Sequence, residues 1–168
     1  MSENRLNEQK LYYQMVITIW ESFCELHRDL YDLACEEYLT LLSSDIDKLE
    51  TMLPKKEEII SRVSLIEKDR ADLISRINSS SVFDLKIERV NDLLKAFDSI
   101  DSQASIPALR NLNALLIDII QKIQEQNKKN QIFLNKAMIS IREIKQGFSG
   151  KKTYTTYGAD GMTRALGR

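Results

Sequence analysis

The chain has 168 residues, of which 43% are hydrophobic and 29% are charged, and its formal net charge is −1. This balance excludes a dedicated nucleic-acid-binding protein, which carries a strong basic excess, and it excludes disorder along the whole chain. No apolar run approaches the ~20 residues that span a bilayer, and the polar first residues do not resemble a secretory signal. We therefore expect a cytoplasmic protein that binds no nucleic acid and has no stable membrane insertion.

Glycine is absent from the first 146 residues, and all five glycines follow from Gly147 onward. Because glycine inside a helix costs roughly 1 kcal/mol relative to alanine, the first part of the chain suits long helices, with Pro54 and Pro107 as the interruptions. The sequence therefore predicts a helical domain over residues 1–147 and a flexible tail over residues 148–168.

The first predicted helix covers residues 6–42. Apolar residues recur there in steps of three and four from Tyr12 to Leu33, and a second apolar stripe beside them indicates contact with two neighbours. A break follows, at which we expect Ser44 to cap the next helix, with Asp45 in its first turn.

A second helix is expected from Ile46 to about Ile77, with a kink or restart at Pro54, because proline removes a helical hydrogen bond. The polar residues 78–81 predict a loop, and a shorter third helix is expected over residues 83–97.

The polar segment 98–105 predicts another turn, after which Pro107 opens a last helix that ends with a glycine C-cap at Gly147. Four helical segments joined by short loops predict antiparallel neighbours. The predicted fold is thus all-α, an elongated antiparallel bundle of about four helices with long first and last helices and a flexible C-terminal tail.

No arrangement of residues indicates catalysis. His27 lies on a helical face beside Phe23 and Tyr31, where a lone histidine is usually structural. Cys24 and Cys35 are eleven residues apart on one helix, too far for a disulfide, and a zinc site built from them with His27 lacks a fourth ligand. We expect reduced, partly buried thiols, no enzyme activity and no cofactor.

Two asparagines occupy apolar positions late in the last helix. Steps of four and three beyond Ile123 reach Asn127 and Asn130, and the next step reaches Leu134. A buried amide needs hydrogen-bond partners. One interpretation is a polar layer that sets the register of packing, and the other is an opening in the core against which a partner packs.

The tail from Gly147 onward carries a net charge of +3 and includes Tyr157, Gly158 and Gly161. One interpretation is an inert, frayed end. The other is a short recognition element, because tyrosine offers a large apolar face with a polar tip, and the two glycines permit a sharp turn.

Together these residues resemble the FlgN family of flagellar type III export chaperones. The resemblance rests on the long leading helix, the turn Ser44-Asp45-Ile46, Leu65-Ile66-Glu67 with Arg70, the pair Asn127 and Asn130, and the terminal Thr156-Tyr157-Gly158-x-x-Gly161. It implies a cytoplasmic chaperone that binds the C-terminal helical region of the hook–filament junction proteins FlgK and FlgL. Such a chaperone prevents premature assembly of these clients and delivers them to the export gate protein FlhA.

The resemblance places export-gate docking on Tyr157, and we extend this site to Gly158 and Gly161. An amphipathic client helix is expected to pack against the last helix. The side chains expected to contact it are Asn127, Asn130, Ile132, Met138, Ile139 and Phe148. The alternatives are a structural or scaffolding coiled-coil bundle that self-associates, and a secretion chaperone for a different flagellar client. We expect a monomer or a weak homodimer.

Overall fold

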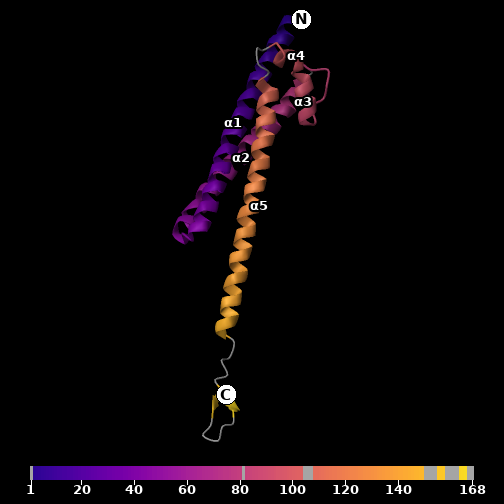
Figure 1. Cartoon of the computed structure of the whole chain (residues 1–168). Coiled ribbons are helices and arrows are strands. Elements are labelled where there is room, and N and C mark those ends of the chain that lie inside the picture. Colours follow the sequence, from indigo (N-terminus) through magenta and orange to yellow (C-terminus); the bar gives the residue numbers. More distant parts are fainter. Residues whose placement is uncertain (1, 81, 104–107, 150–154, 158–162, 166–168) are drawn as a thin grey trace. The chain divides into compact units, whose positions relative to one another are not determined.

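The computed structural model describes residues 2–80, 82–103, 108–149, 155–157 and 163–165. Their elements are α1 (Ser2–Ser43), α2 (Ile46–Ser80), α3 (Val90–Ala96), α4 (Asp98–Asp101), α5 (Ala108–Ser149), β1 (Thr155–Tyr157) and β2 (Thr163–Ala165) (Figure 1). The chain divides into a first unit, Met1–Asn130, and a second unit, Gln131–Arg168. The predicted all-α fold with long first and last helices is confirmed, although five helices are described where the sequence predicts about four.

The turn between α1 and α2 is closed by the backbone. Ser44 has a left-handed φ of 56°, its N–H donates to the Leu41 carbonyl at 3.2 Å, and the Asp45 N–H donates to the Thr40 carbonyl at 3.2 Å. These two bonds form a Schellman motif that ends α1. The Lys48 N–H donates to Asp45 Oδ1 at 3.0 Å, so Asp45 caps α2, and the predicted cap at Ser44 is wrong.

Helix α2 runs through Pro54 without a break, so the predicted restart is wrong. The turn before Pro54 packs on α1 through the buried Met52, and the turn after it is held by Lys56, whose Nζ lies 2.9 Å from Glu37 Oε2 of α1. Packing on both sides offsets the hydrogen bond that proline removes. The helix also extends to Ser80, through most of the predicted loop.

The predicted third helix over residues 83–97 begins only at Val90. Upstream of it, the Asn78 side chain donates to the Ile87 carbonyl and accepts from the Ile87 N–H, each at 2.9 Å. This pairing satisfies both backbone groups of Ile87 outside a helix. The Arg89 N–H then donates to Asp92 Oδ2 at 2.9 Å, where α3 starts.

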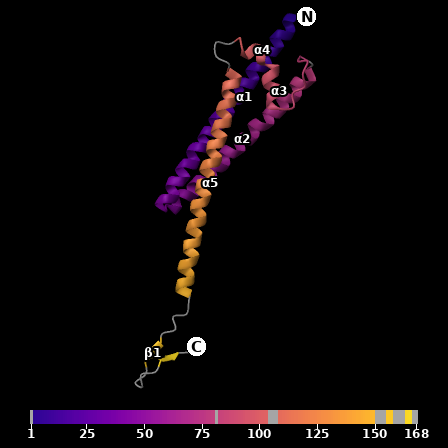
Figure 2. The same cartoon turned by 45° about the vertical axis from the view of Figure 1, so that its right-hand side comes forward.

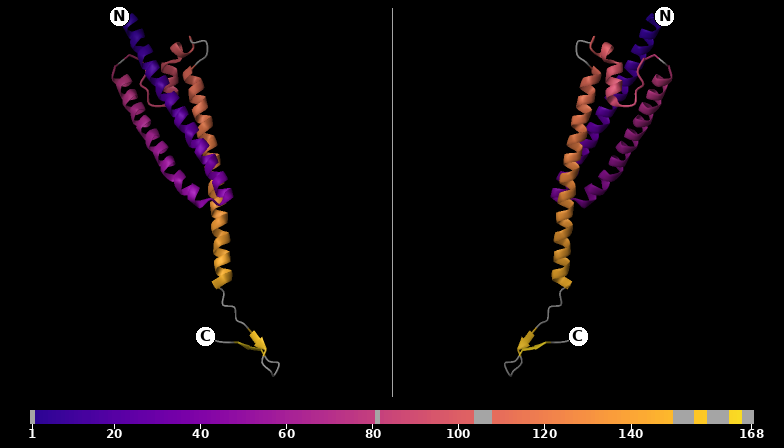
Figure 3. Two further views of the ribbon diagram at one scale, coloured as in Figure 1. Left: turned by 90° about the vertical axis from the view of Figure 1, so that its left-hand side faces the viewer. Right: turned by 90° about the vertical axis from the view of Figure 1, so that its right-hand side faces the viewer.

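The first unit has its hydrophobic core where the first half of α1, the end of α2, the segment after it, α3 and the start of α5 meet. Figures 2 and 3 show α3 in the space between the end of α2 and the start of α5. The buried core residues are Tyr12, Tyr13, Val16, Trp20, Leu73, Ile77, Val82, Ile87, Leu93, Phe97 and Leu109.

Because α3 and α4 are short, the chain stays at this end of the first unit before α5 begins. As a result the first-unit part of α5, residues 108–130, runs parallel to α1 (Figures 1 and 3). Hydrogen bonds follow the same order along both helices: Trp20 Nε1 donates to Asn113 Oδ1 at 3.3 Å, and Asn130 Nδ2 donates to the Ala34 carbonyl at 3.0 Å. In an antiparallel bundle of about four helices, which the sequence predicts, the first and last helices would instead be antiparallel.

In the second unit, α5 continues past Gly147 to Ser149, so the predicted C-cap at Gly147 is wrong. A Cβ added at this glycine would meet nothing within 4 Å. Strands β1 and β2, which the sequence does not predict, pair antiparallel with Tyr157 opposite Thr163.

Candidate functional site

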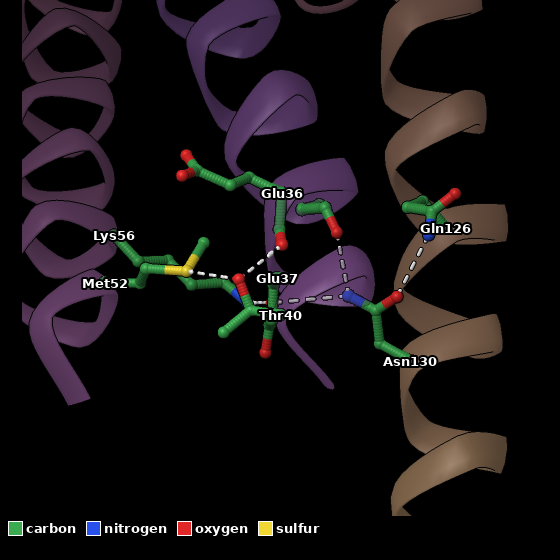
Figure 4. A network of polar contacts seen from close by, with 8 residues as sticks. Glu36, Glu37, Thr40, Met52, Lys56, Gln126 and Asn130 are labelled. Atoms are coloured by element: carbon green, nitrogen blue, oxygen red, sulfur yellow. Dashed lines mark hydrogen bonds and ion pairs between the residues drawn. The ribbon is translucent and has the colours of Figure 1, made fainter. Parts of the chain in front are cut away.

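Asn130 is the best-defined of the predicted site residues. Its side chain is 3% exposed, and Nδ2 donates to the Ala34 carbonyl at 3.0 Å and to Glu37 Oε2 at 3.3 Å (Figure 4). Its Oδ1 accepts from Gln126 Nε2 at 3.0 Å. The amide is therefore satisfied inside the first unit, which is the arrangement of a polar layer that sets packing register.

This layer joins three helices. Glu37 of α1 accepts from Asn130 of α5 and from Lys56 Nζ of α2, the latter at 2.9 Å (Figure 4). Next to it, Thr40 Oγ1 donates to the Glu36 carbonyl at 2.9 Å and lies 3.7 Å from the Met52 sulfur. A one-turn slip of α5 against α1 would leave the Asn130 amide without these partners, so the layer fixes where the two helices meet.

Asn127 differs from Asn130 although both occupy the same predicted seam. It is exposed, and its amide has no hydrogen-bond partner among the described residues. The structure thus leaves Asn127 free to contact a partner and engages Asn130 internally.

Beyond Asn130, α5 exposes a series of large apolar side chains. In the second unit these are Ile132, Met138, Ile139, Ile141 and Ile144, which are between 46% and 59% exposed. Scattered single apolar residues are normal on a protein surface, but five within 13 residues form a patch. We call this surface of α5 the distal apolar surface.

The distal apolar surface has two faces. At about 100° per residue, Ile132 and Ile139 share one face, and Met138 and Ile141 share another, which Ile144 adjoins three residues after Ile141; Ile139 and Ile141 are about 160° apart. The half-buried Leu134 lies on the face of Met138 and Ile141, which continues the apolar seam of the first unit. The structure therefore does not bring Ile132, Met138 and Ile139 together on one face.

For the remaining predicted site residues the structure describes the backbone at most. Phe148 lies in α5 and Tyr157 ends β1, but their side chains are outside what is described. Gly158 and Gly161 lie outside the described residues altogether. The predicted docking role of the tail stays a prediction.

A groove with a volume of about 670 Å³ opens in the first unit between α1, α2, the start of α3 and α5. Its lining includes Trp20, Phe23, Val63 and Ile117, with the ion pair of Glu67 and Arg70 at the side of α2. The Arg70 guanidinium donates hydrogen bonds to the Glu67 carboxylate, which raises the pKa of Arg70, so the guanidinium stays charged. Sequence reasoning did not identify this groove, because it depends on how far α2 and α5 lie apart.

The two cysteines are free and at least partly buried, as the sequence predicts, and His27 contacts its own helix. Cys24 is buried, Cys35 is half-buried, and both are free thiols. Burial raises the pKa of the Cys24 thiol, whose sulfur donates to the Leu112 carbonyl at 3.4 Å. His27 Nδ1 lies 2.7 Å from the Phe23 carbonyl of its own helix.

Within the described part of the chain, no group of three or more His, Cys, Asp or Glu side chains could hold a metal ion. Among the helices described, none has the length and apolar content needed to cross a membrane.

The comparisons with known proteins give one match. The family model described as FlgN protein matches residues 12–165, from α1 to the end of β2. The matched region therefore contains the polar layer, the distal apolar surface and the tail strands. Comparison with curated proteins and with solved structures gives no match.

Proposed function

We propose, from the premise that this chain belongs to the FlgN family of flagellar export chaperones, that its clients are the hook–filament junction proteins FlgK and FlgL. It binds their C-terminal helical region in the cytoplasm. Because the apolar residues of that region are then covered, the clients do not assemble prematurely. The distal apolar surface of α5 is the observation that supports this proposal, because an amphipathic helix is recognised by laying its apolar face on such a surface.

The exposed fractions indicate a moderate affinity. Fully burying an Ile or Met side chain contributes about 1.5–3 kcal/mol, so completing the burial of a half-exposed one contributes on the order of 1 kcal/mol. Because these side chains lie on two faces of α5, a client helix on one face covers two or three of them and gains roughly 2–3 kcal/mol before the costs of association and of ordering the client. Such a complex holds its client and also releases it at the next step.

We place delivery in the tail. Tyr157 ends β1, beyond the last residue of α5, and with Gly158 and Gly161 it forms the proposed docking element for the export gate protein FlhA. A tyrosine can supply much of the energy of a small interface. The family resemblance supports this assignment, as does the place of Tyr157 in the second unit, outside the unit that contains the described core.

The test measures binding of the C-terminal segment of a junction protein to the full chain by isothermal titration calorimetry. Met138→Ala with Ile141→Ala removes one apolar face, and Ile132→Ala with Ile139→Ala removes the other, without changing charge or lowering helix propensity. We expect at least one pair to weaken binding by about tenfold or more.

The matched control is Ile117→Ala, because Ile117 is on the same helix and 59% exposed, but lines the first-unit groove. We expect this variant to bind like the wild type. If both distal double variants bind the client segment like the wild type and Ile117→Ala weakens that binding, the client-binding site is the first-unit groove. If the chain binds no client segment but self-associates, and both distal double variants abolish the self-association, the protein is a scaffold.

A further inference from the structure

The near-neutral chain consists of two units of opposite charge. The first unit, Met1–Asn130, carries 17 Lys and Arg against 23 Asp and Glu, a net charge of −6. The second unit, Gln131–Arg168, carries seven Lys and Arg against two acidic residues, a net charge of +5. A sign asymmetry of this size indicates that the two units meet different partners.

The cations of α5 in the second unit pair with no acid among the described residues. All seven ion pairs between described residues lie in the first unit. Lys136, Arg142 and Lys145 are exposed, and none has an ion pair among the described residues. Glu143, the one acid nearby, is one and two residues from Arg142 and Lys145, a spacing at which helix side chains do not face each other.

These cations lie beside the apolar side chains. Lys145 follows Ile141 by four residues and lies on the face of Met138 and Ile141, and Arg142 follows Met138 by four and lies at the edge of that face. On the other face, Lys136 follows Ile132 by four residues and precedes Ile139 by three. Each apolar face therefore has a cation next to it, as in helix pairs where flanking charges select the partner.

We propose that the partner helix on the distal apolar surface carries acidic side chains beside its apolar face, and that these pair with Lys136, Arg142 and Lys145. The inference rests on the proposed function and adds the chemistry of the client. Charge complementarity at the rim of an apolar contact accelerates encounter and excludes wrong partners more than it adds affinity. An acidic client is thus distinguished from other amphipathic helices in the cell.

The test uses three fluorescently labelled amphipathic peptides of about three heptads with the same Leu and Ile face. Their flanking positions are all Glu, all Gln or all Lys. Fluorescence anisotropy measures their affinity for the full chain at low salt. We expect the Glu peptide to bind about tenfold more tightly than the Lys peptide, since exposed ion pairs are individually weak. Physiological salt should reduce this difference.

The deciding variant is Lys136→Glu with Arg142→Glu and Lys145→Glu, which should reverse the order of the peptides. Its matched control is Lys10→Glu with Arg62→Glu and Lys68→Glu, because these first-unit cations are also exposed and unpaired among the described residues. The control has the same net charge and should keep the preference for the Glu peptide.

Equal binding of the three peptides would overturn the inference. If the client segment still binds in that case, the proposed function stands. A preference for the Glu peptide in a chain that does not bind the client segment would keep the inference about the surface and end the proposed function. Two other outcomes would replace the acidic helix by another occupant. One is binding to phosphatidylserine vesicles without peptide preference, and the other is a dimer that the deciding variant dissociates.

Discussion

Asp101 is the residue whose replacement should do most damage to the fold. Its carboxylate is 1% exposed, and Oδ1 accepts from the Tyr13 hydroxyl at 2.6 Å and from the Leu109 N–H at 2.9 Å. Oδ2 accepts from the Arg110 N–H at 3.3 Å. Leu109 and Arg110 are in the first turn of α5, so Asp101 performs from α4 the task of an N-cap and connects it to α1.

Asp101→Ala should lower the free energy of unfolding by about 3–5 kcal/mol. Hydrogen bonds to a charged group contribute about 1.5–3 kcal/mol each, and the loss of three is partly offset because a buried charge no longer needs to be desolvated. The variant leaves the buried Tyr13 hydroxyl and the Leu109 N–H without their partner. At 2–4 °C per kcal/mol, the expected decrease in Tm is about 6–20 °C.

The same cluster predicts how stability depends on pH. Burial raises the pKa of Asp101, but the hydrogen bonds from Tyr13, Leu109 and Arg110 outweigh it and hold that pKa below its ordinary value. The contribution of Asp101 to the free energy of unfolding is therefore fully present above its pKa in the unfolded chain, near 4. It is lost as the pH falls through the lower pKa that Asp101 has in the folded protein. Burial and the bond to Asp101 raise the pKa of Tyr13 to about 12, so its contribution is present below pH ~10 and is lost as pH rises toward 12.

Thermal and urea unfolding, followed by circular dichroism, measure the effect. The control is Asp98→Ala, because Asp98 is on the same short helix but forms an exposed ion pair with Arg110, which should cost less than about 1 kcal/mol. Asp101→Asn keeps the shape of the side chain and removes its charge, so its destabilisation should lie between those of Asp101→Ala and Asp98→Ala. If Asp101→Ala were no more destabilising than Asp98→Ala, the reasoning that the buried carboxylate organises the start of α5 would be refuted.

Three further changes test other parts of the molecule. Asn130→Ala should lower the free energy of unfolding by about 1–3 kcal/mol, because Glu37 and the Ala34 carbonyl lose a donor, and urea unfolding would show no change if the layer were irrelevant. Gly147→Ala should raise the helicity of α5 and stabilise it by up to about 1 kcal/mol, since a Cβ there meets open space; a decrease in helical signal would contradict this. Tyr157→Ala should leave Tm and client affinity unchanged and weaken binding to the FlhA cytoplasmic domain by about tenfold or more, as surface plasmon resonance can measure.

Much of the candidate site could be predicted from the sequence because it depends on helical periodicity. The seam that ends in Asn127 and Asn130 follows from steps of three and four, and the long first and last helices follow from the confinement of glycine to the tail. The 100° step also separates Ile132 from Met138, and the sequence shows that basic residues outnumber acidic ones after Asn130. These features are properties of one helix or of composition, so neighbouring segments do not alter them.

Only the tertiary structure decides whether the local preference of a residue for or against helix is followed. Pro54 stays inside a helix because the turns on both sides of it pack on α1, and Ile87 stays outside one because the Asn78 amide satisfies its backbone. Asn127 and Asn130 have the same residue type and the same periodicity, but only Asn130 lies opposite Ala34 and Glu37. Hydrogen bonds between residues about 90 positions apart depend on where whole helices lie, and a pattern read along one helix carries no information about that placement.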